Sequence, residues 1–135
     1  MEHFFECNPD MKDKIEFTGV ISDRQSLAEE FAGAKIFVIA SDWESFGLVT
    51  IEAMSQGCYI VGTDIKSTRE ITAGTGFASL FSCGDTDALG KALCKAAEND
   101  ELLDRTRDEA AKYAEENYAW KASLSAVAEW IGKQG

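Results

Sequence analysis

Two glutamates, Glu44 and Glu52, flank a glycine, Gly47, with seven residues between the two carboxylates. Carboxylates are strong acceptors for hydroxyl groups, and glycine lets a ligand approach the backbone closely. If a helix begins near Gly47, its first N–H groups and its dipole favour an anion there. Glu52 then lies about 7 Å further along the helix axis, at about 1.5 Å per residue. The chemistry predicted is the binding of an anion flanked by two hydroxyl-bearing groups.

The segments around these residues have the pattern of a βαβ unit. Ile36–Ile39 is a short apolar run typical of a buried strand, and Cys58–Val61 is a second one. Between them, apolar residues recur at helical spacing from Leu48 to Gln56, and Gly57 supplies a helix stop. In such a unit the helix begins beyond the carboxyl end of the first strand, where open parallel sheets bind ligands.

The stretch from Glu44 to Gly57, ESFGLVTIEAMSQG, resembles the signature of the retaining, nucleotide-sugar-dependent glycosyltransferases of family 4 (group 1, GT-B fold). Further landmarks of that family occur in order and at similar spacing. These are Ile15–Gly19 upstream, and Ile60–Asp64, Glu70–Ile71, Gly76–Ala78 and Gly84–Asp85 downstream. The resemblance runs from about Ile15 to Trp120, which is nearly the whole chain.

Strand and helix patterns alternate, which predicts an α/β fold with a parallel sheet of about four strands and C-terminal helices. The resemblance implies a Rossmann-like sheet, taken from a six-stranded family domain ordered 3-2-1-4-5-6 whose first two strands are absent here. It also implies that the acceptor domain and a glycine-rich turn with basic residues are missing. We therefore expect residues 1–135 to be a partial C-terminal donor-binding domain: residues 1–14 a remnant of a preceding element, residues 15–85 the sheet and crossover helices, and residues 86–135 the C-terminal helices.

The remaining elements follow from the same patterns. They are strands at Ile15–Gly19 and Phe77–Phe81, helix starts at capping boxes Ser22–Gln25 and Ser67–Glu70, and helices from Thr86 onward, the last beginning at Trp120.

The resemblance also implies roles for individual residues. The donor-binding set is Glu44, Ser45, Phe46, Gly47, Leu48, Glu52, Val20 and Ile21. Within it, Glu44 would contact the donor sugar as the catalytic residue, and Glu52 would bind the ribose hydroxyls. Backbone N–H groups at Phe46–Leu48 would stabilise the departing phosphate, as the helix-end argument also predicts. The donor is a nucleoside diphosphate sugar, so no cofactor is expected, and without an Asp-x-Asp or histidine cluster no metal is expected either.

The composition of the chain excludes some classes of binding partner. The formal net charge of −11 argues against nucleic acid or anionic membrane, because both need a basic surface. No apolar run approaches the roughly 18 residues of a membrane-spanning helix. The four cysteines show no paired spacing, and Cys58 and Cys94 lie in apolar surroundings. We therefore expect buried free thiols there, and a cytoplasmic protein.

Three functional hypotheses remain open. The chain is the donor-binding part of a glycosyltransferase, inactive alone, or a fold relic or interaction module of the same fold, or a fragment of a GT-B sugar-nucleotide epimerase. In the second, Glu44 merely caps the helix electrostatically and Glu52 is a solvated surface charge. A homo-oligomer is expected through the edge of the Ile36–Ile39 strand, or through the face that would normally meet the acceptor domain.

Overall fold

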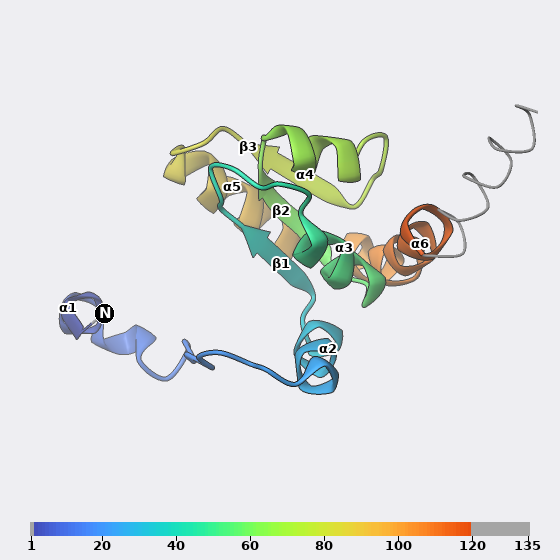
Figure 1. The fold of residues 1–135 in the computed structure, drawn as a ribbon. Coiled ribbons are helices and arrows are strands. Elements are labelled where there is room, and N and C mark those ends of the chain that lie inside the picture. Colours follow the sequence, from blue (N-terminus) through green and yellow to red (C-terminus); the bar gives the residue numbers. More distant parts are fainter. Residues whose placement is uncertain (1, 120–135) are drawn as a thin grey trace, which may run out of the picture.

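The computed structural model describes residues 2–119, and the chain enters the fold through a short N-terminal arm. This arm contains α1 (Glu2–Cys7), the 3₁₀ helix η1 (Pro9–Met11) and residues 15–23, which form neither helix nor strand. Figure 1 shows α1 and η1 lying apart from the sheet.

Strands and helices alternate in the rest of the chain, as the sequence predicts. In order they are α2 (Arg24–Gly33), β1 (Ile36–Ile39), α3 (Leu48–Ser55), β2 (Tyr59–Thr63), α4 (Lys66–Ile71), β3 (Ala78–Phe81), α5 (Thr86–Ala97) and α6 (Asp100–Tyr118). The three strands form one parallel sheet in the order β1-β2-β3. The α/β class and the parallel sheet are therefore confirmed.

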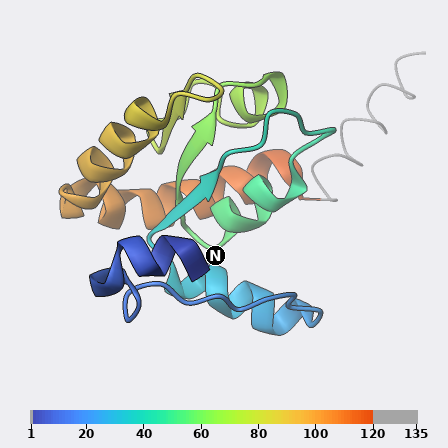
Figure 2. The same cartoon turned by 90° about the vertical axis from the view of Figure 1, so that its left-hand side faces the viewer.

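The core lies around the central strand, β2, because all five of its residues are buried. Helix α3 packs against α6 and α2, whereas α5 packs against β2 and β3. In Figure 2 the sheet is seen from its β1 edge, with α3 and α5 on opposite sides of it. The loop after β1 and the start of α4, which follows β2, both lie at the end of the sheet toward which β1 and β2 point.

Two glycines set the limits of α3. Gly47 precedes the helix with φ +84°, and Gly57 follows it with φ +85°, a backbone region that residues with a Cβ rarely adopt. A Cβ on Gly57 would also lie only 2.7 Å from the carbonyl oxygen of Arg107 in α6. Gly57 therefore ends the helix and lets it meet α6 closely, so the predicted helix and its stop are both confirmed.

The strand predicted at Ile15–Gly19 is wrong, and the sheet has three strands where about four were expected. All five of these residues are exposed, and no strand of the described residues pairs with them. A strand-type sequence becomes a strand only when a neighbour satisfies its backbone groups. This segment has no such neighbour in the structure.

Both predicted capping boxes are wrong as well. Helix α2 begins one residue later than expected, with Asp23 as its N-cap, and the Asp23 carboxylate accepts a 2.7 Å hydrogen bond from the Ser26 N–H. That bond lowers the pKa of the Asp23 carboxyl. Helix α4 already begins at Lys66, so Ser67 lies inside its first turn and makes no cap.

The two cysteines expected to be buried differ in their exposure. Cys58 is buried, as predicted, but Cys94 is exposed because it lies on the outer side of α5. The helix predicted from Trp120 lies outside the described residues. Among residues 2–119, the structure contains no helix that is long and apolar enough to cross a membrane.

Candidate functional site

A cavity of about 420 Å³, the main cavity of the candidate site, opens at the end of the sheet toward which β1 and β2 point. Its walls come from the loop after β1 (residues 42–46), the start and the last turn of α4 (residues 65–67, 70 and 71) and Tyr118 at the end of α6. Carboxyl ends of parallel strands are the usual place for ligands in open α/β sheets. The cavity therefore lies where the sequence predicts a ligand.

Helix α3 begins beside this cavity without a capping side chain. Its N-cap is Gly47, which has none to offer, so the first N–H groups of the helix receive no side-chain hydrogen bond there. A Cβ on Gly47 would lie 3.0 Å from Cδ1 of Ile71 and 3.9 Å from Cβ of Ser67. The start of α3 thus faces α4 across a very short gap. Open N–H groups and the helix dipole together favour an anion.

Two buried hydroxyl groups at this junction have no hydrogen-bond partner, namely Thr50 Oγ1 and Ser67 Oγ. Thr50 lies in the first turn of α3, and Ser67 lies in the first turn of α4. A buried hydroxyl left unsatisfied costs about 1–3 kcal/mol. The junction of the two helices therefore has unused polar groups, which a bound polar ligand or water would satisfy.

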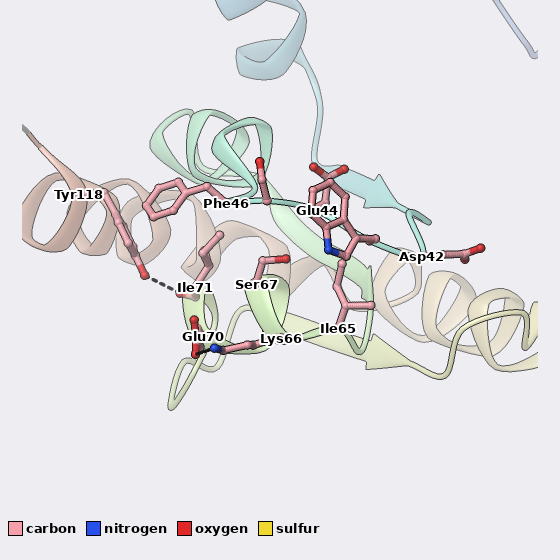
Figure 3. Close-up of a pocket in the computed structure, with 11 residues that line it drawn as sticks. Asp42, Glu44, Phe46, Ile65, Lys66, Ser67, Glu70, Ile71 and Tyr118 are labelled. Atoms are coloured by element: carbon pink, nitrogen blue, oxygen red, sulfur yellow. Dashed lines mark hydrogen bonds and ion pairs between the residues drawn. The ribbon is translucent and has the colours of Figure 1, made fainter.

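The carboxylates of the loop differ in orientation. Glu44 lines the cavity, is half-buried and accepts a 2.7 Å hydrogen bond from Ser41 Oγ. Asp42 points away from the other labelled side chains (Figure 3) and accepts a 2.8 Å hydrogen bond from Cys83 Sγ. That bond raises the pKa of the Cys83 thiol above its usual value. Glu44 is therefore the carboxylate of the loop that is held at the cavity.

Glu52 lies in different surroundings. It lines two further hollows, one of about 460 Å³ between α3 and α6 and one of about 170 Å³ between α3 and α2. Glu44 lines neither of them, and Glu52 does not line the main cavity. The structure thus does not bring the two carboxylates into one cavity. A ligand that touches both must extend over the start of α3, with Gly47 beneath its middle.

The other residues of the predicted donor-binding set also differ in whether they line the main cavity. Ser45 and Phe46 line the main cavity, and Leu48 opens α3 with 63% of its surface exposed. Val20 is 92% exposed, and Ile21 is half-buried ahead of α2. Neither lines a described hollow, although the hollow of about 170 Å³ between α3 and α2 includes Arg24, the first residue of α2.

Of the eleven residues in the wall, eight were not predicted as site residues, among them Lys66, Glu70 and Tyr118. Tyr118 Oη donates a 3.4 Å hydrogen bond to the carbonyl oxygen of Ile71, and burial raises the pKa of its hydroxyl. Figure 3 shows Tyr118 and Glu44 on opposite sides of Ser67, with Lys66 and Glu70 along a third side. Lys66 and Glu70 follow strand β2, so the rule that ligands bind beyond strand ends could have found them.

No group of three histidine, cysteine, aspartate or glutamate side chains close enough to hold a metal ion occurs in residues 2–119. The groups present at the site are carboxylates, hydroxyls, the backbone N–H groups of a helix start and one ammonium group, that of Lys66. These groups fit a ligand with hydroxyls at both ends and an anionic centre.

Comparison with known proteins assigns the chain. Residues 8–132 match the family described as glycosyl transferases group 1, and the chain belongs to this family. It is 32% identical over 107 residues to a D-inositol 3-phosphate glycosyltransferase of Streptomyces griseus, covering 78% of this chain and 22% of that protein. It is 30% identical over 114 residues to a phosphatidyl-myo-inositol mannosyltransferase of Mycobacterium leprae, covering 84% of this chain and 30% of that protein.

A solved structure agrees on the fold. The sucrose-phosphate synthase of Thermosynechococcus elongatus superposes with a TM-score of 0.80 at 20% identity, covering 99% of this chain and 34% of that chain. The recognised family and the GT-B type of fold are therefore confirmed. The chain spans under a third of the length of these curated relatives.

Proposed function

We propose that this chain binds a nucleoside diphosphate sugar, as the donor-binding part of a retaining glycosyltransferase that transfers the sugar to an acceptor hydroxyl. The observation that carries this proposal is the uncapped start of α3 beside the cavity, with two unpartnered hydroxyls, Thr50 Oγ1 and Ser67 Oγ, at the junction of α3 and α4. The family assignment supports it, because both curated relatives named above carry the name of a sugar transferase.

The proposed pose follows the division of the site. The diphosphate lies over Gly47, where the backbone of Phe46–Leu48 provides N–H donors and stabilises charge on the leaving phosphate. The sugar enters the main cavity against Glu44, the proposed catalytic residue, with Ser45 beside it. The ribose reaches Glu52 on the other side of α3. The base then lies near the start of α2, toward Val20 and Ile21.

Two single variants test these roles. Glu52→Ala should weaken a nucleotide and its nucleotide sugar alike, whereas Glu44→Ala should weaken the nucleotide sugar alone. We expect wild-type affinity near millimolar, or about −4 kcal/mol, because few charged groups hold the ligand. Glu30→Ala, an exposed glutamate on α2, is the matched control for lost negative charge. Equal losses for both ligands in Glu44→Ala would overturn the division of roles.

Compartment and association remain parts of this proposal. Cys58, Cys83 and Cys94 are free thiols, which supports a reducing compartment, the cytoplasm. In the described residues one edge of β1 has no strand beside it, and Val38 on this strand is 40% exposed. Open strand edges promote association, so we propose a homodimer or larger assembly. Light scattering at micromolar concentration checks this, and a monomer of 14.8 kDa at low and high salt would refute it.

A further inference from the structure

The walls of the main cavity carry an unfavourable charge for an anion. Two carboxylates, Glu44 and Glu70, line it against a single cationic side chain, Lys66, while the carboxylate of Asp42, also in the wall, points away. A diphosphate brings at least two more negative charges. Like charges at close range repel, so a diphosphate here needs a cation in addition to the start of α3.

Lys66 is free to provide that charge, because its present partner holds it weakly. Its ammonium group lies 3.9 Å from Glu70 Oε1, one turn further along α4, and the two side chains are 86% and 68% exposed. Such exposed pairs contribute little to stability. Figure 3 shows the pair beside the cavity, with the lysine side chain extended toward Glu70.

The position of Lys66 places it next to the proposed diphosphate. Its neighbour Ser67 is one of two α4 residues that approach Gly47: a Cβ on Gly47 would lie 3.9 Å from Cβ of Ser67 and 3.0 Å from Cδ1 of Ile71. The unpartnered hydroxyl of Ser67 lies at the same junction. The flexible four-carbon stem of a lysine at this point can turn toward a phosphate over the first turn of α3.

We propose that Lys66 is a phosphate-binding residue that exchanges Glu70 for the distal phosphate of a nucleoside diphosphate. This inference rests on the proposed function and adds to it a charged contact on α4. It also predicts selectivity: a nucleoside diphosphate gains from Lys66, whereas a nucleoside monophosphate held at α3 alone gains little.

The test is an NMR titration of the full chain with uridine and guanosine mono- and diphosphates. Lys66→Ala should weaken diphosphate binding about 3- to 10-fold and monophosphate binding less than about twofold. Lys66→Arg should keep most of the wild-type diphosphate affinity. Arg105→Ala is the matched control, because it removes one positive charge from a similar exposed pair, with Glu109 at 3.7 Å, on α6. This control should leave both affinities unchanged.

A second variant tests the exchange itself. Glu70→Gln should tighten diphosphate binding more in the wild type than in the Lys66→Ala background, where it removes only the repulsion between Glu70 and the phosphates. Equal gains in the two backgrounds would overturn the exchange. Equal diphosphate affinities for wild type and Lys66→Ala would overturn the role of Lys66 and leave the proposed function standing. If no nucleotide shifts any amide of residues 44–52 in the wild type, the proposed function fails and this inference fails with it.

Discussion

Of the four segments predicted to be strands, Ile36–Ile39 becomes one and Ile15–Gly19 is the one that does not. Ile36–Ile39 forms β1, pairs with β2 along its whole length and leads directly into the loop of Glu44. Ile15–Gly19 also contains apolar and β-branched residues, Ile15, Phe17 and Thr18, yet it is exposed and pairs with no strand of the described residues. The difference lies in their neighbours. A strand is stabilised by the strands and helices that pack on it, and the candidate site is built only where such packing exists.

The largest expected effect concerns catalysis. The walls of the main cavity come from residues 42–71 and Tyr118, and the N-terminal arm contributes nothing to them. Holding an acceptor against the donor is worth about 7–11 kcal/mol. The 135-residue chain alone should therefore show no sugar transfer to any acceptor in an assay of radiolabelled donor. Transfer faster than hydrolysis by solvent would mean that the arm, or a second copy, supplies the opposite wall.

A matched pair of substitutions tests the comparison of the two segments directly. Ile39→Ala removes a side chain that is 6% exposed in β1 and should destabilise the fold by about 2–5 kcal/mol. Ile15→Ala makes the same change where the side chain is 39% exposed and unpaired, and should cost less than about 1 kcal/mol. Urea unfolding measures both. Equal losses would show that the arm packs on the sheet in solution.

The helix caps provide a smaller test, because they also contrast a local feature that forms with a predicted one that does not. Asn99 is the N-cap of α6, and its side chain accepts a 2.9 Å hydrogen bond from the Leu102 N–H, so Asn99→Ala should cost about 1 kcal/mol. Ser22, the cap that the sequence predicted for α2, does not cap that helix. Ser22→Ala should therefore leave the urea midpoint within error, and a loss similar to that of Asn99→Ala would restore the capping box.

Local pattern was enough to predict the central βαβ unit, since the strand runs, the helical spacing and Gly57 all agreed. It failed where structure depends on distant parts of the chain. Whether Ile15–Gly19 pairs is decided by a neighbour that no local pattern shows. The first capping box failed because Ser22 and Asp23 are both good caps and it is Asp23 that bonds the Ser26 N–H, and the second failed because α4 already begins at Lys66.

The same limit applies to the candidate site. The sequence placed Glu44 at the carboxyl end of β1, where the structure has it. It could not show that Glu52 opens onto other hollows, because those are formed by α2 and α6, which are distant in sequence. It also assigned Ser67 and Glu70 to a cap, although the structure places both on the cavity wall.

The central claim is that a nucleotide sugar binds over the start of α3, and mapping amide shifts by NMR tests it most directly. Titration with UDP- and GDP-sugars should shift the amides of residues 44–52 and 65–71, with half-saturation at about 1 mM for at least one of them. Shifts confined to α5, to the N-terminal end of α6 near Asp100 or to the N-terminal arm would contradict the claim. So would the absence of any saturating shift up to about 10 mM, at which binding is too weak to be specific.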